Sequence, residues 1–458
     1  MAKLKRTTIT NMTSVSEVEA RQACNIDFLK YNVDNKSEDT YQAVQLPNEI
    51  TIKVLSYLDT IEVLRMATVC KSWKDLIHTT PSVWRNIHLQ LSCNRKSSHN
   101  KRTFLCAQQF GMHFRKLSVS CSHDHQTAIC KFMAIDFRKL LLSLHQTSLT
   151  SIKITDLQLR GALLSTVKSI TEILTRILSR SDRIQCFKMS SAQFRVEEGI
   201  NVLDTVFSES RGTLETLYVD TFFRESLLGY PRREQDKLTN GILSLTRLTK
   251  LGIDYLHLTD GFLTALSRSH AGQLKRLTIV AKYLMDDGPR IFNYGTKLAT
   301  NSWLTLAGSC PELKVVFVTD GYTLARLNSC MEILDRVMPI YKIKLMLDFG
   351  YHDDLNSSRF TNLLNEITAN FRNSLVKLEL EHWHPTGQID AAFLDLVRKC
   401  QLLTHIKATA YFSDPETERI ALELVHARRR QQEMRESQEM PNKRAKLTPA
   451  DGPGSDPA

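Results

Sequence analysis

The ten cysteines of this 458-residue sequence include no CxxC pair. They are scattered along the chain, at positions 24, 70, 93, 106, 121, 130, 186, 310, 330 and 400. This pattern excludes a disulfide scaffold and predicts a reduced, intracellular protein. No run approaches the ~18 consecutive apolar residues of a membrane span. The basic start MAKLKRTTITNMTS has no apolar segment behind it, which excludes a secretory signal.

Recognisable catalytic motifs are missing as well. The sequence contains no GxSxG, P-loop or GxGxxG motif, and no Cys–His pair stands in a known catalytic frame. What it does contain is 42% hydrophobic residues, enough for one large domain with accessories or for two to three domains. Lys and Arg outnumber the acids by 60 to 49, a net charge of +11 that suits an acidic partner or weak attraction to nucleic acid.

Composition divides the chain into four parts. Residues 1–43 are polar and predict a disordered arm, and residues 44–90 form a compact apolar segment. Residues 91–427 alternate short apolar runs with helix-like stretches. Residues 428–458 begin as a basic, charged helical extension and end rich in Pro, Gly, Asp and Ala, which predicts a disordered end.

The stretch LPNEITIKVLSYLD (46–59) carries more apolar side chains than one core-facing stripe needs. At 100° per residue its apolar positions cover an arc of roughly 220°, against about 100° for a surface helix packed on a single core. These positions are Ile50, Ile52, Val54, Leu55, Tyr57 and Leu58. Asp59 and Glu62 then predict a capping box that starts a second helix. About 40 residues cannot bury this much apolar surface alone, so a partner is expected to cover part of it.

The residues Leu46-Pro47-x-Glu49, Val54-Leu55-Ser56-Tyr57-Leu58, Val69-Cys70-Lys71-x-Trp73 and Trp84 resemble the F-box. The resemblance implies docking on the Skp-family adaptor of a cullin-RING ubiquitin ligase, with Leu46 and Pro47 in the adaptor's groove. The implied adaptor-binding residues are Leu46, Pro47, Glu49, Val54, Leu55, Leu58, Val69, Cys70, Trp73 and Trp84. The alternative is a helical hairpin of the main domain with no external partner.

An L-x-x-L-x-L-like phrase recurs ten times behind this segment. Its fourth residues lie at positions 117, 152, 187, 217, 251, 277, 316, 343, 378 and 406. Each phrase predicts a short strand, and each interval has room for one helix and turns. The pattern resembles an irregular leucine-rich-repeat solenoid, an α/β fold with a parallel sheet and outer helices. An ordinary α/β domain with scattered strands is the alternative.

The third, fifth and seventh positions of each phrase are expected on the concave face of the sheet. Basic residues there outnumber acids, and apolar side chains such as Val315, Phe317, Tyr218 and Met346 are interspersed. The predicted substrate-binding residues are Lys250, Arg276, Phe317, Lys342, Lys344, Lys377 and Lys407. Charge-assisted hydrogen bonds from such a surface favour an acidic or phosphorylated target. The alternative is that these lysines only solvate an exposed sheet.

Two His-containing clusters resemble metal sites only weakly, so no metal and no cofactor is predicted. CSHDHQTAIC places Cys121, His123, His125 and Cys130 at a spacing that fits no standard zinc site. EHWHP offers only His382 and His384.

The tail contains two basic groups twelve residues apart: Arg428, Arg429 and Arg430, then Lys443, Arg444 and Lys446. The arrangement resembles a bipartite nuclear import signal, read by an import receptor as an extended segment. Deleting residues 428–447 is expected to shift the protein to the cytoplasm; a solvated charged extension is the alternative.

The combined reading is a non-catalytic substrate-recognition subunit of an SCF-type ligase in the nucleus or cytoplasm. Its expected partners are the adaptor, through it the cullin and RING proteins, a target protein and an import receptor. The rival reading is a nuclear protein that binds protein or nucleic acid and whose F-box-like segment is incidental. A hydrolase built on the repeats lacks any motif.

Overall fold

The computed structural model describes residues 46–93, 98–122, 131–144, 146–181, 183–224, 232–282, 297–322, 333–347, 356–382, 389–409 and 412–445. The predicted N-terminal arm and the end of the tail lie outside these ranges. From Ile52 onward the described chain forms one compact unit. Within the described ranges, no helix combines the length and the apolar character needed to cross a membrane.

The first described residues form short helices, as the sequence predicts. They are α2 (Asn48–Leu55), α3 (Thr60–Met66), α4 (Lys71–Thr79) and the 3-10 helix η1 (Pro81–Trp84). The capping box is confirmed: the Glu62 N–H donates to Asp59 Oδ1 and the Asp59 N–H donates to Glu62 Oε2, both at 2.8 Å. The Cys70 side chain starts α4 by accepting from the Trp73 N–H. Local side-chain bonds therefore fix the starts of α3 and α4.

The next segment forms a single parallel sheet of eleven strands in chain order. The strands are β1 (Asn86–Ser92), β2 (Lys116–Ser122), β3 (Ser151–Thr155), β4 (Cys186–Ser190), β5 (Thr216–Tyr218), β6 (Lys250–Asp254), β7 (Arg276–Lys282), β8 (Lys314–Tyr322), β9 (Ile340–Leu347), β10 (Lys377–His382) and β11 (His405–Thr409). The anchor residues of all ten predicted phrases lie in strands β2–β11. The first six anchor residues, from Leu117 to Leu277, pair with one another in one continuous row.

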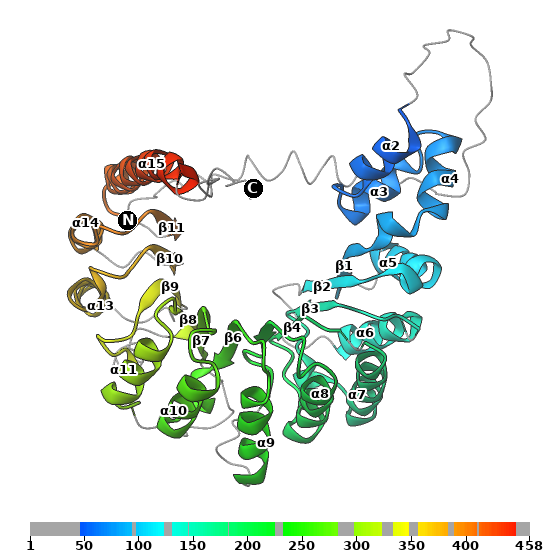
Figure 1. Ribbon diagram of the computed structural model, residues 1–458, viewed down its shortest axis with the longest axis horizontal. Coiled ribbons are helices and arrows are strands. Elements are labelled where there is room, and N and C mark those ends of the chain that lie inside the picture. Colours follow the sequence, from blue (N-terminus) through cyan, green and yellow to red (C-terminus); the bar gives the residue numbers. More distant parts are fainter. Residues whose placement is uncertain are drawn as a thin grey trace, which may run out of the picture. The chain divides into compact units, whose positions relative to one another are not determined.

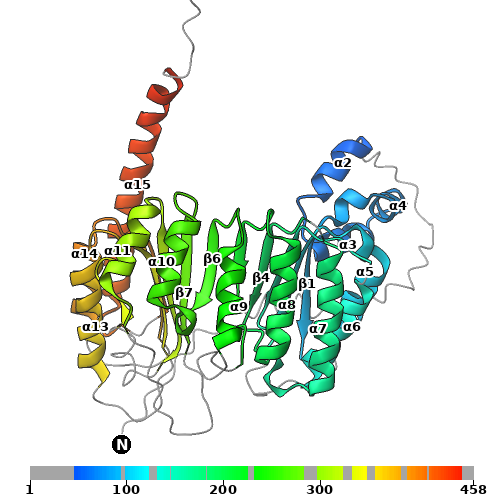
Figure 2. The same cartoon turned by 60° about the horizontal axis from the view of Figure 1, so that its bottom comes forward.

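The helices between the strands lie together on one face of the sheet, and the strands line the other face (Figures 1 and 2). They are α5 (Ser98–Phe110), α6 (Lys131–Ser143), α7 (Leu164–Ser179), α8 (Val196–Glu209), α9 (Arg232–Leu243), α10 (Asp260–Ser269), α11 (Thr300–Ser309), α13 (Asn356–Phe371) and α14 (Asp390–Lys399). Helix α15 (Pro415–Ala445) follows the last strand and packs against α14 and β11. Short 3-10 turns add η2 (Gly111–His113), η3 (Leu159–Gly161) and η5 (Tyr255–His257). The predicted fold class, a helical start followed by a leucine-rich-repeat-like α/β solenoid, is confirmed.

The core lies between the sheet and these helices. Strand residues alternate, as in β1, where Ile87, Leu89 and Leu91 are buried and their neighbours are more exposed. Each repeat buries its apolar residues against the adjacent repeats, which is why no single unit would fold alone.

In β8 the predicted register is wrong by one residue. Arg276 pairs with Lys314 and Leu277 with Val315, so Lys314, not Val315, occupies the position expected on the concave face. Leu274 and Leu313 are both buried before their strands, but one residue fewer separates Leu313 from β8. Phe317 and Val315 are consequently fully buried in the core. Phe317 is therefore not available as a substrate contact, contrary to the sequence prediction.

A buried histidine lies where the chain leaves β6. The His257 ring packs edge-to-face on Phe223, and its Nε2 lies 3.8 Å from Asp254 Oδ2. Both carboxylate oxygens of Asp254 also accept from the Thr221 N–H. Burial lowers the pKa of His257 to about 4. His257 is therefore neutral in the folded protein at pH values where an unfolded histidine is protonated.

The stability of the solenoid should consequently fall as the pH drops from about 6.5 toward 4. In that window the unfolded chain binds a proton at His257 that the folded chain does not bind. The free energy of unfolding is therefore highest above pH 6.5, and it falls by roughly 3 kcal/mol as the pH drops to about 4. Urea unfolding at several pH values measures this. His257→Gln should flatten the profile in part, leaving the contributions of His270 and His405, whose pKa values burial also lowers. His426→Gln, at an exposed site on α15, should not flatten it.

Candidate protein-binding surfaces

Large apolar side chains are exposed along the first helices. They are Leu46, Ile50, Val54, Tyr57, Ile61 and Val69. Tyr57 is the most open, at 79%. Exposed apolar residues at this density mark an interaction site rather than ordinary surface. Of these, Ile61 had no place in the sequence prediction, although it follows Tyr57 at a helical spacing.

The predicted adaptor-binding residues divide by exposure. Six are exposed: Leu46, Pro47, Glu49, Val54, Val69 and Cys70. Leu58 and Trp73 are half-buried. Leu55 and Trp84 are fully buried in the protein's own core, so the prediction that they contact an adaptor is wrong.

Trp84 joins the helical segment to the solenoid. Its indole Nε1–H donates to the Ile77 carbonyl at 2.8 Å. Its ring stacks on Phe110 of α5, with centroids 3.8 Å apart and an interplanar angle of 7°. The sequence pattern could not separate an adaptor contact from this internal one, because both require a large apolar side chain at the same position.

A row of basic residues crosses the concave face at the N-terminal ends of β6–β11. Register pairing places Lys250 beside Arg276 and Arg276 beside Lys314, and it also places Lys342 beside Lys377 and Lys377 beside His405. We call these six residues the basic row. Adjacent strands lie about 4.8 Å apart, and like charges opposite each other are destabilising. The sequence predicted Lys250, Arg276, Lys342 and Lys377 here but missed Lys314 because of the register difference in β8.

Three predicted substrate-binding lysines already have carboxylate partners. Lys342 Nζ lies 2.6 Å from Glu379 Oε1. Lys344 and Lys407 both lie near Glu381 Oε1, at 3.6 and 3.4 Å. Within the described residues, Lys250, Arg276, Lys314 and Lys377 have no such partner. Four of the six residues of the basic row are therefore cations without a carboxylate partner in the described part of the chain.

Tyr218 provides an aromatic surface on the same face. Its ring lies directly over Gly252 of β6, where an added Cβ would come within 2.2 Å of Tyr218 Cδ1. Lys188 Nζ lies 5.3 Å from the ring centroid, and Tyr218 is half-exposed. Met346 is also half-exposed. These two apolar side chains, unlike Val315 and Phe317, remain accessible to a partner.

The described residues contain no group of three or more His, Cys, Asp and Glu side chains placed to hold a metal ion. Cys121 is buried at the end of β2, and burial raises its pKa. His123, His125, Cys130 and His384 lie outside the described ranges.

The first basic group of the tail belongs to the folded solenoid. Helix α15 runs through the predicted boundary at residue 428. The Arg428 guanidinium donates to the carbonyls of Val397, Arg398 and Cys400 at the end of α14, and Arg429 pairs with Glu433. Arg428–Arg430 are thus helical rather than extended. Lys443 and Arg444 also fall in α15, Lys446 lies outside the described residues, and the import signal stays a prediction.

Residues 43–90 match the family model described as F-box-like. A search of curated proteins found no match to this chain. In general, F-box domains bind Skp-family adaptors in SCF-type ubiquitin ligases, and F-box proteins are non-catalytic adaptors. The matched range contains α2, α3, α4 and η1, and the eleven-stranded parallel sheet follows it. The chain therefore contains an F-box-like domain at residues 43–90, followed by an α/β solenoid.

Proposed function

We propose that the protein is the substrate-recognition subunit of an SCF-type ubiquitin ligase. The observation that carries this proposal is the F-box-like domain at residues 43–90 whose helices leave large apolar side chains exposed. Burying a Val or Ile side chain in an interface yields roughly 1.5–3 kcal/mol, so these residues suit a stable adaptor contact.

In this proposal the chain itself performs no chemistry. The F-box-like domain binds the adaptor and, through it, the cullin and RING proteins. The solenoid holds the target near a ubiquitin-charged enzyme and so raises its effective concentration. The hydrophobic core continues from α3 and α4 to β1, with Trp84 at the junction. This continuity supports a rigid connection between these helices and the solenoid.

The test is co-expression of the full chain with a Skp-family adaptor, followed by purification through a tag on the chain. The expected result is a stoichiometric complex that survives gel filtration. A well-folded chain that elutes without adaptor would contradict the proposal.

We further propose that the basic row contacts the target. Lys250→Glu combined with Arg276→Glu should reduce target capture at least tenfold, because two unpaired cations become anions facing an acidic partner. Targets are first trapped with an adaptor-blind variant, and their recovery is then compared by quantitative mass spectrometry. Lys275→Glu is the matched control, since Lys275 adjoins Arg276 but pairs with Glu312 at 3.0 Å outside the row. Equal losses in both variants would exclude the basic row as the contact.

The same unbalanced charge supports one second candidate, a non-enzymatic nuclear protein that binds nucleic acid. That function requires affinity for DNA or RNA that falls steeply as salt rises, since counterions are released on binding. Titration of labelled oligonucleotides against the full chain at several salt concentrations tests it. Weak, salt-insensitive binding would remove this candidate.

A further inference from the structure

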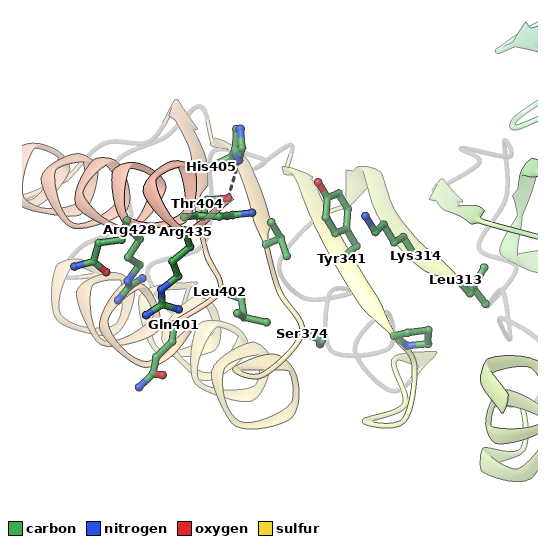
Figure 3. Close-up of a pocket in the computed structure, with 14 residues that line it drawn as sticks. Leu313, Lys314, Tyr341, Ser374, Gln401, Leu402, Thr404, His405, Arg428 and Arg435 are labelled. Carbon is green, nitrogen blue, oxygen red and sulfur yellow. Dashed lines mark hydrogen bonds between the residues drawn. The ribbon is translucent and has the colours of Figure 1, made fainter. Parts of the chain in front are cut away.

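A hollow of about 590 Å³ lies at the N-terminal ends of β8–β11, against the side of α15. Figure 3 shows Lys314 and Tyr341 on one side, Arg428 and Arg435 on the other, and Leu402 between them. The hollow overlaps the end of the basic row, because Lys314 and His405 belong to both. Helix α15 adds residues that the row does not contain, so the hollow is a more enclosed part of the same surface.

A β-bulge builds the first end of this hollow. Val315 pairs with Ile340 and Val316 with Lys342, which leaves Tyr341 as an extra residue in β9. Bulges re-aim side chains. The Tyr341 ring lies 4.9 Å from Lys314 Nζ and 5.8 Å from Lys377 Nζ, measured to the ring centroid. Two ammonium groups are thus held beside one aromatic ring.

Helix α15 builds the second end. Arg428 and Arg435 are seven residues apart, so they lie on the same face of the helix. The Arg428 guanidinium is occupied by the α14 carbonyls. Within the described residues Arg435 has no carboxylate partner. A single guanidinium is therefore available at this end, not a cluster.

Among the residues that the structure describes, none that lines the hollow is acidic. The surroundings of His405, also in the lining, agree with this: burial lowers its pKa, and the charges of Lys377 and Arg429 lower it further. The hollow is thus positive at both ends, while Leu402, an exposed apolar side chain, lies in its middle.

The spacing of these features fits an extended peptide that crosses the strand ends. Lys314 of β8 and His405 of β11, both in the lining, are three inter-strand steps apart, about 14 Å, and α15, which carries Arg435, packs against β11. Residues i and i+4 of an extended chain are also about 14 Å apart, and residues i, i+2 and i+4 point the same way. Phosphate groups are normally held by clusters of arginines. One available guanidinium at one end and lysines at the other suit single carboxylates instead.

We propose that this hollow binds an extended acidic segment of the target protein, with Asp or Glu at positions i and i+4 and an apolar residue at i+2. One carboxylate lies at Lys314 and Lys377 beside Tyr341, and the other lies at Arg435. The apolar side chain covers Leu402. This inference rests on the proposed role of the solenoid in target binding, but it does not depend on the adaptor.

The test is fluorescence anisotropy of the full chain with a labelled peptide containing Gly-Glu-Ser-Leu-Ser-Glu-Gly. Arg435→Glu and Lys314→Glu should each weaken binding at least tenfold. Arg430→Glu is the control, because Arg430 is an exposed arginine of the same helix that does not line the hollow. It carries the same charge change and should alter binding less than twofold.

Three peptides complete the test: one with both Glu replaced by Gln, one with the acids at i and i+3, and one with phosphoserine in place of Glu. Weak binding of the first two supports the proposal. Equal binding of the Gln peptide, or equal losses in Arg430→Glu and Arg435→Glu, would overturn it. Binding of the phosphoserine peptide without the Glu peptide would overturn the assignment to carboxylates. Adaptor recovery is measured on the same preparations, so failure of peptide binding is separable from failure of the ligase role.

Discussion

Ile50→Asp combined with Val54→Asp should reduce recovery of the Skp-family adaptor at least 100-fold. Both side chains are exposed on α2, one helical turn apart. Burial of each yields roughly 1.5–3 kcal/mol in an interface, and an unpaired carboxylate placed there adds a desolvation cost. The loss of about 3–6 kcal/mol corresponds to at least two orders of magnitude in the dissociation constant. Pull-down titrations or surface plasmon resonance with purified adaptor measure this change.

The same substitutions should leave the fold intact, since exposed sites away from caps and core rarely change stability by more than about 0.5 kcal/mol. Leu163→Asp is the matched control, because Leu163 is an exposed leucine at the start of α7, outside the F-box-like domain. It should leave adaptor recovery unchanged. If the α2 variant and the control bound the adaptor equally well, the exposed face of α2 would not be the adaptor surface.

The sequence predicted the strands best, because their recurring apolar pattern has a single physical cause. Ten strands were predicted because each repeat must bury an apolar residue of its strand between the sheet and the helices, and this requirement recurs along the chain. The missed strand, β1, has the same alternation in Ile87, Leu89 and Leu91. It is preceded by Trp84 instead of the leucine that begins most phrases, and the resemblance to the F-box assigns that tryptophan to the adaptor.

Other features could not be read from the sequence because they depend on contacts between distant residues. Because one residue fewer precedes β8 than precedes β7, Lys314 and not Val315 lies on the concave face. Partners for Lys342 and Lys344 depend on the register with β10, which places Glu379 and Glu381 within reach. The hollow depends on a bulge at Tyr341 and on the docking of α15, neither of which leaves a local signal.

The F-box-like segment illustrates why apolar density alone is ambiguous. A helix with apolar side chains on two faces needs something to bury each face, and the protein's own core buries only one of them. Leu55 is fully buried while Val54, the adjacent residue, is exposed. The spacing count correctly predicted that the protein's own core leaves part of the helix's apolar surface exposed, but it could not say which side chains are buried and which are exposed.

Trp84→Ala should lower the free energy of the first unfolding transition by about 3–5 kcal/mol, as for other buried aromatic residues truncated to alanine. The substitution removes the stack on Phe110 and leaves a cavity at the junction with α5. It also removes the donor to the Ile77 carbonyl. Urea unfolding followed by far-UV circular dichroism measures the effect; the first transition is the relevant one because repeat arrays can unfold in parts.

Trp84→Phe separates the two contributions, since a phenyl ring retains most of the stacking and loses only the hydrogen bond and some volume. It should therefore cost clearly less than Trp84→Ala. Adaptor binding measured at low temperature, where Trp84→Ala remains folded, should be nearly unchanged, because the buried indole has no surface to offer a partner. The opposite pattern, full stability with lost adaptor binding, would return Trp84 to the adaptor interface and would mean that the stack on Phe110 contributes nothing. Stability changes only in the first outcome and adaptor binding changes only in the second. The two variants therefore decide whether Trp84 belongs to the interface or to the junction.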